Sequence, residues 1–165
     1  MDLIRTLKHL AHPDWLTRRA FSRRSLQAIE AVITDSERQH CGELRFVVEG
    51  GLGVLALRRG SSSRERALDW FSQLRVWDTE HNSGVLIYVQ LVDRRVEIVA
   101  DRGIHRRVGT DQWQHISRQM EMAFKQQQFE AGALAGIAAV SGVLAAHFPP
   151  EGDNPDELPN APTMV

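Results

Sequence analysis

Residues 75–104 of the chain are RVWDTEHNSGVLIYVQLVDRRVEIVADRGI, and the rest of the fold is expected to form around them. Residues 85–91 are almost continuously apolar, which is typical of a strand that is buried on both faces. A polar break at residues 93–95 separates them from a second predicted strand at residues 96–100. Because this connection is so short, the two strands are predicted to pair as an antiparallel hairpin.

The hairpin brings two polar loops to one end of the sheet. Its second strand ends beside the start of its first, so residues 101–103 are expected to lie close to residues 77–82. If a further strand at residues 44–49 runs parallel to residues 85–91 through a right-handed crossover, Glu43 joins the same edge. The polar residues predicted at this edge are Glu43, Asp78, Asn82 and Asp101.

Two chemical roles are open for this edge. Hard cations such as calcium and magnesium prefer carboxylate and amide oxygens, so these four residues are candidate ligands of a divalent cation. Arg75 and Arg102 are candidate partners of phosphate or another anion. The same acidic residues also fit helix caps, turns or plain ion pairs, since no linear metal motif is present. The glycine-rich turn at residues 50–53 completes neither a GxGxxG nor a Walker motif, so no organic cofactor is predicted.

Length and composition narrow the class of protein. The chain has 165 residues, of which 42% are hydrophobic and 25% charged, and this is typical of one soluble globular domain. Its net charge of −1 provides no general attraction to nucleic acid, so no nucleic-acid partner is predicted. Cys41 is the only cysteine, which excludes an intrachain disulfide. Neither a signal peptide nor a transmembrane run is recognisable, so a cytoplasmic location without a transmembrane segment is expected.

Hydrophobic spacing predicts helices between the strands. They are expected at residues 2–11, from Ser22 to Gly42, at residues 63–74, from Thr110 or Asp111 onward, and from Phe129 to the prolines at 149–150, with a short edge strand at residues 54–57. This order predicts an α/β fold, a three-layer α/β/α sandwich with a small mixed sheet. The chain is divided into an amphipathic helix and linker (1–21), a domain (22–148) and an acidic, proline-rich tail (149–165) that is predicted to be disordered.

The first helix is amphipathic, with Leu3, Ile4, Leu7 and Leu10 at helical spacing. Its surroundings are basic, because residues 1–24 contain six lysines and arginines and two aspartates. Two interpretations follow. The helix either packs on its own domain or contacts a membrane surface or a partner protein through residues 1–21.

Residues from about 22 to 146 resemble the TPM domain. The matching residues are Ser36-Glu37, Gly42-Glu43, Arg66-Ala67, Phe71, Trp77, Asn82-Ser83-Gly84-Val85-Leu86, Asp93-Arg94-Arg95, Ile98 through Gly103, Phe124, Phe129, Glu130 and Gly132. The resemblance implies a βαβαββα-like TPM fold. It also implies calcium binding and acid phosphatase activity, as in plant members. Carried over to this chain, the acidic candidates are Glu43, Asp78 and Asp101, with Asp93 at the opposite turn.

This chain also departs from the family. Most relatives are exported and tethered by a membrane helix, and the usual Gly-Asp before the aromatic residue of the last joint is Gln127-Gln128 here. Two functions therefore stay open. The preferred one is a soluble binding or adaptor module with a protein partner, associated with the maintenance of membrane proteins or the envelope. The alternative is a metal-assisted phosphomonoesterase, in which a cation polarises the phosphoryl group.

Overall fold

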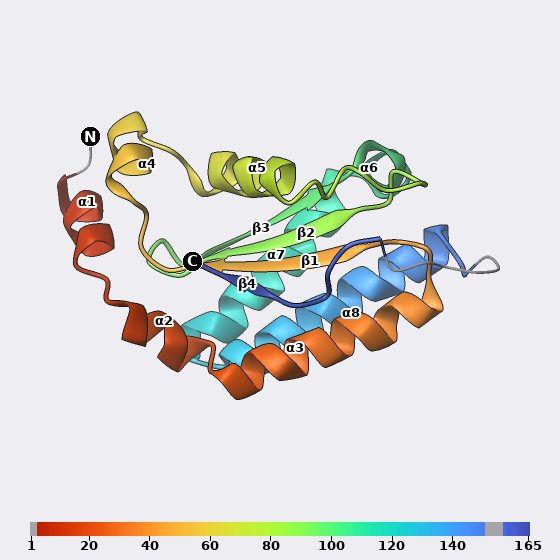
Figure 1. Ribbon diagram of the computed structural model, residues 1–165, viewed down its shortest axis with the longest axis horizontal. Helices are drawn as coiled ribbons and strands as arrows, with labels where there is room; N and C mark the ends of the chain where they lie inside the picture. The colour runs from red at the N-terminus through yellow and green to blue at the C-terminus, as the bar shows by residue number, and fades with distance from the viewer. Residues whose placement is uncertain (1–2, 151–156) are drawn as a thin grey trace.

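The computed structural model of the protein describes residues 3–150 and 157–165, and a four-stranded mixed sheet lies at its centre (Figure 1). The strand order is β3-β2-β1-β4. The strands span Leu44–Glu49 (β1), Val85–Gln90 (β2), Arg95–Ala100 (β3) and Thr163–Met164 (β4). β2 and β3 pair in antiparallel fashion, and β1 runs parallel to β2. The predicted hairpin and the predicted parallel crossover are both confirmed.

Helices cover both faces of this sheet (Figure 1). On one face lie α3 (Arg23–Ser36), α7 (Thr110–Lys125) and α8 (Phe129–His147), and on the other lies α5 (Ser63–Gln73). Ser22 is the N-cap of α3, because its hydroxyl accepts a hydrogen bond from the Ser25 amide at 3.1 Å. The predicted three-layer α/β/α sandwich is therefore confirmed.

The two central strands are buried at every residue. Because side chains alternate along a strand, each strand supplies two cores. Phe46 and Ile87 contribute to the larger core under α3, α7 and α8, whereas Leu86 and Tyr88 belong to the smaller core with α5. This double burial explains why the sequence of β2 is almost continuously apolar.

Several short elements were not predicted as they are found. They are α2 (Asp14–Ala20), the 3-10 turn η1 (Glu37–Gln39), α4 (Val54–Arg59) and α6 (Arg102–Val108). The helix predicted at residues 2–11 is confirmed as α1 (Leu3–Leu10). The predicted edge strand at residues 54–57 is wrong, because this run forms α4, which ends at Gly60 with a φ of 68°. A short apolar run is compatible with either structure, and this one lies beyond the end of β1, where the sheet offers no neighbour.

The C-terminal segment contradicts the predicted disorder of residues 149–165. Residues 151–156 lie outside the described residues, but residues 157–165 return to the sheet and end in β4. The amide of Val165 donates to the Val48 carbonyl, and the amide of Gly50 donates to the Val165 carbonyl, both at 2.9 Å. Leu158 is buried in the smaller core. The segment pairs with β1, which would otherwise expose unpaired amide and carbonyl groups at a sheet edge.

Among the described helices, α8 alone is long and apolar enough to cross a membrane by length and composition. In the fold it serves as a core helix, since Ile137, Val140 and Leu144 are fully buried against the sheet and its neighbouring helices. Core helices of soluble proteins pass the same test, so α8 is weak support for a membrane span.

Candidate functional site

The end of the sheet where β1 and β2 begin brings two of the predicted positions together, Glu43 and Asp101. The Val85 amide donates to the Glu43 carbonyl, and the Asp101 amide donates to the Gly84 carbonyl, both at 2.8 Å. Glu43 and Asp101 therefore flank the start of β2 on its two sides. This juxtaposition follows from the hairpin and the crossover, as the sequence predicts.

Glu43 nevertheless has a structural role. Its side chain is almost completely buried, and its carboxylate accepts hydrogen bonds from the amides of Glu157 (3.3 Å) and Leu158 (3.2 Å). These bonds hold the C-terminal segment against the start of β1. Each oxygen of this carboxylate accepts one backbone amide, which leaves fewer lone pairs for a metal ion.

Asp101 caps α6 and keeps one oxygen without a partner. Its Oδ1 accepts from the Arg102 amide at 2.6 Å. Its Oδ2 is buried and has no hydrogen-bond partner within the described part of the chain. Asp101 lines a cavity of about 430 Å³ together with Asn82, Arg102 and His105. Buried carboxylate oxygens in proteins usually accept a hydrogen bond from the chain or from water, or bind an ion.

The other predicted residues are not gathered into this cavity. Asp78 and Arg75 are exposed and do not line it. Within the described ranges 3–150 and 157–165, no three histidine, cysteine, aspartate or glutamate side chains lie close enough to hold a metal ion. Of the four predicted cation ligands, Asp101 and Asn82 line this cavity, whereas Glu43 and Asp78 do not.

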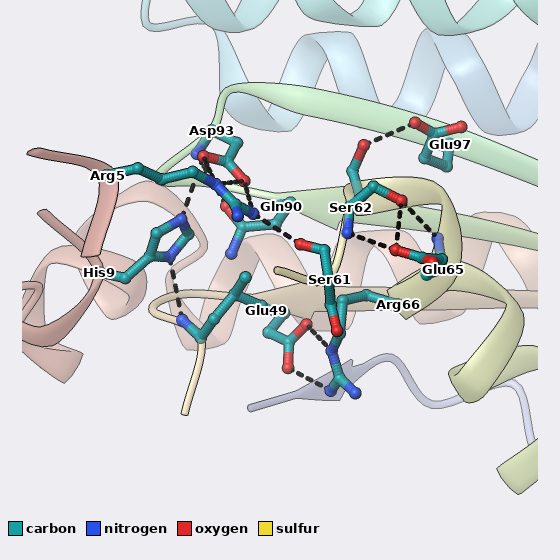
Figure 2. A network of polar contacts seen from close by, with 12 residues as sticks. Arg5, His9, Glu49, Ser61, Ser62, Glu65, Arg66, Gln90, Asp93 and Glu97 are labelled. Atoms are coloured by element: carbon teal, nitrogen blue, oxygen red, sulfur yellow. Dashed lines mark hydrogen bonds and ion pairs between the residues drawn. The ribbon is translucent and has the colours of Figure 1, made fainter. Parts of the chain in front are cut away.

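The opposite end of the sheet holds a buried ionic network that the sequence did not predict (Figure 2). Glu49, the last residue of β1, accepts from Arg66 of α5 at 2.6 Å and 3.1 Å and from the hydroxyl of Tyr88. The hydrogen bonds that Arg66 donates to Glu49 raise the pKa of Arg66. Burial, followed by the Glu49 charge, raises the pKa of Tyr88. This network joins β1, β2 and α5.

A second part of the network attaches α1 to the domain (Figure 2). The Arg5 guanidinium forms an ion pair with Asp93 at 2.8 Å and donates to the Ser61 carbonyl at 2.9 Å. His9 is buried between Asp93, 3.1 Å from its Nε2, and the Leu52 amide, which donates to its Nδ1 at 3.0 Å. Because Nδ1 accepts, the proton lies on Nε2 and is donated to Asp93.

Electrostatics favour the charged form of Asp93. Burial by itself would raise the pKa of Asp93, but the hydrogen bonds from Arg5 and His9 outweigh it and hold that pKa below its usual value.

The close approach of α1 also requires Gly51, since a Cβ atom there would lie 2.4 Å from the His9 carbonyl oxygen. The glycine-rich turn thus makes room for α1.

The orientation of α1 is the reverse of what its composition predicts for a helix in a soluble domain. Arg5 and His9, four residues apart, face the domain, and the apolar stripe lies on the opposite side of the helix. The side chains of this stripe are Leu3 (65% exposed), Ile4 (67%), Leu7 (59%) and Leu10 (54%). Trp15 of α2 is also 59% exposed. We call these five residues the apolar face.

The sequence predicts the apolar stripe of α1, but the residues that hold this helix with its stripe exposed were not predicted. The sequence contains a pattern that could have indicated these residues, because Arg5 and His9 lie four positions apart on the side of the helix away from the leucines. Their acceptor Asp93 is more than eighty residues away in the chain. The contact therefore depends on tertiary structure.

Comparisons with known proteins agree with this architecture. A sequence model of the TPM domain matches residues 17–143. The chain is similar to the BA42 protein of the psychrophilic bacterium Bizionia argentinensis, with 32% identity and a TM-score of 0.76 over 88% of this chain and 95% of BA42. It shares its fold with the N-terminal domain of a P. gingivalis protein, with 18% identity and a TM-score of 0.64 over 79% of this chain and 82% of that domain. No curated protein sequence matched. This chain therefore belongs to the TPM domain family.

Proposed function

We propose that this protein is a peripheral binding module that attaches to an anionic membrane surface through α1 and α2. The observation that supports the proposal is the inverted packing of α1. Arg5 and His9 hold its polar side on the domain, while the apolar face is exposed. A folded domain rarely leaves a contiguous apolar stripe in water, and such stripes mark interaction sites.

The expected energies agree with reversible binding. Fully burying a leucine or isoleucine side chain is favourable by about 1.5–3 kcal/mol, so moving these half-exposed side chains into lipid contributes roughly 1 kcal/mol each. The indole of Trp15 suits the membrane–water interface. Lys8, Arg18 and Arg19 of the same two helices are exposed, and each basic residue near an anionic surface adds about 1 kcal/mol.

Vesicle sedimentation tests this proposal. The full chain is expected to sediment with vesicles of phosphatidylcholine and phosphatidylglycerol, and the triple variant Leu3→Ser, Leu7→Ser, Leu10→Ser to remain in the supernatant. These side chains are exposed, so the fold should survive. Leu68→Ser, which alters an exposed leucine on α5, is the matched control and should sediment like the unmodified chain. Equal sedimentation of the triple variant would overturn the proposal, and a protein partner for the apolar face would then be sought.

A second candidate function is favoured by the unpaired Oδ2 of Asp101. The cavity that it lines also contains Asn82, Arg102 and His105, which suit a divalent cation beside an anionic group such as a phosphate monoester. A bound calcium or magnesium ion would supply Lewis-acid chemistry. Asp101 and Asn82 would hold the ion, and Arg102 would orient the anion.

Thermal unfolding with calcium, magnesium or manganese tests this second candidate. A ligand at about one hundred times its dissociation constant stabilises a protein by roughly 2.7 kcal/mol. We expect such a shift in the unmodified chain and its loss in Asp101→Asn. Absence of a shift with all three metals would leave Asp101 as a helix cap only, and phosphatase assays would then have no metal site to build on.

A further inference from the structure

A groove of about 820 Å³ lies beside α1, at the end of the sheet where α1 docks. It is bounded by α1 and α2, by the loop after β2, and by the joint between α7 and α8. Its apolar lining residues are Ala11, Leu16, Ala20, Val89, Leu91, Val92, Phe124 and Phe129. The volume is within the range of about 300–1,000 Å³ that is usual for small-molecule sites.

The polar lining of this groove is basic. Lys8, Arg19, Arg94 and Arg95 all line it, and among residues 3–150 and 157–165 no acidic residue does. Within the described part of the chain, no ion pair involves Lys8, Arg19 or Arg94. The guanidinium of Arg95 has a loose contact with Glu121 at 3.8 Å. We call this feature the basic groove.

Asp93 lies close in sequence to this groove but does not neutralise its positive charge. Asp93 precedes Arg94 in the same turn, but its carboxylate is bound by Arg5 and His9 on the other side. The imidazole of His12 also lines the groove and shares a hydrogen bond of 2.9 Å with the Thr17 hydroxyl. Burial, followed by the nearby His9, lowers the pKa of His12, so the positive charge at neutral pH comes from lysine and arginine.

We propose that the basic groove binds the headgroup phosphate of an anionic phospholipid, with the glycerol and the first acyl carbons on its apolar floor. Guanidinium groups bind phosphate oxygens in bidentate geometry, and the apolar floor suits acyl carbons. Lys8 and Ala11 of the groove belong to the helix whose leucines form the apolar face. This inference rests on the proposed function. The membrane that α1 contacts would be the source of the lipid, because its headgroups would lie beside the groove.

Calorimetric titration with a soluble lipid separates the basic groove from the apolar face. The probe is dihexanoyl phosphatidic acid below its micelle concentration, and dihexanoyl phosphatidylcholine and inorganic phosphate are the comparison ligands. We expect the full chain to bind phosphatidic acid most tightly. The double variant Arg19→Gln, Arg94→Gln should lose at least about tenfold in affinity, because each charged hydrogen bond contributes roughly such a factor. Arg58→Gln, Arg59→Gln, which removes two exposed arginines of α4 outside the groove, is the matched control and should keep its affinity.

The outcomes distinguish this inference from the proposed function. If the serine triple variant of the apolar face keeps its affinity for the soluble probe but no longer binds vesicles, both proposals are supported. If the full chain binds vesicles but not the probe, the groove inference is overturned and the proposed function stands. Equal losses in the two arginine double variants, or equal affinity for inorganic phosphate or for phosphatidylcholine, would also overturn it.

Discussion

The two ends of the sheet use charged residues in different ways. At the amino end, Glu43 holds the C-terminal segment through two amides and Asp101 caps α6, so carboxylates mainly satisfy the backbone. At the carboxyl end, Glu49 and Asp93 are paired with arginines from other elements. The first arrangement closes the fold, whereas the second attaches α1 with its apolar face outward. Acidic residues at a sheet edge are thus not by themselves a sign of a metal site.

The buried ion pair at the carboxyl end should give the largest effect on stability. Arg66→Ala leaves the Glu49 carboxylate buried without its cation, which is expected to cost about 3–5 kcal/mol in the free energy of unfolding. Urea unfolding measures it. Arg38→Ala, which removes an exposed pair with Asp35, should change stability by less than about 1 kcal/mol. Similar losses in the two variants would remove the energetic distinction between the buried and exposed pairs.

The corresponding change at the amino end should act more locally. Glu43→Ala removes the acceptor of the Glu157 and Leu158 amides, which is expected to cost about 1–3 kcal/mol. Hydrogen exchange of these amides and of Val165 should accelerate, because the C-terminal segment loses its attachment. Glu30→Gln, an exposed change on α3, should leave all three protected. Unchanged exchange at Leu158 in Glu43→Ala would contradict this role.

Release of α1 is a smaller and separable effect. His9→Ala leaves the Leu52 amide without its acceptor and removes one partner of Asp93, at an expected cost of about 1–2 kcal/mol. The Leu52 amide should lose its protection from exchange, while the Leu158 amide at the other end keeps it. Thr6→Ala, a change at a partly buried position of α1, serves as the comparison. Loss of protection at both ends would show that the two ends are coupled.

Low pH is expected to reduce the free energy of unfolding through two histidines, and this is the smallest of the expected effects. Burial is the main cause that lowers the pKa of both His12 and His40 in the folded chain. The unfolded chain then binds more protons as the pH falls below about 6.5, so stability is complete above that value and decreases toward the folded pKa values. Urea midpoints at about pH 7.5 and pH 5 should show the decrease. His40→Gln should reduce the slope, because it removes one of these two groups. An unchanged slope in this variant would contradict the assignment.

Local sequence patterns were sufficient where the residues of one short segment determine its structure. The apolar run at residues 85–91 and the short break after it determine a hairpin, since no other pairing fits so brief a connection. Ser22 as the cap of α3 and the stripe of α1 are equally local. Local patterns failed for residues 54–57, which suit a strand or a helix, and for the C-terminal segment, whose composition resembles a disordered tail.

The sequence by itself therefore determined strands β1, β2 and β3, the layered α/β class and the placement of Glu43 and Asp101 at one edge of the sheet. The tertiary structure alone decided what those residues do. Glu43 meets Leu158 across 115 positions and Arg5 meets Asp93 across 88, and no periodicity records such partners. Spacing along a chain specifies which side of an element a residue occupies, but hydrogen bonds and burial depend on what the remainder of the fold places against that side.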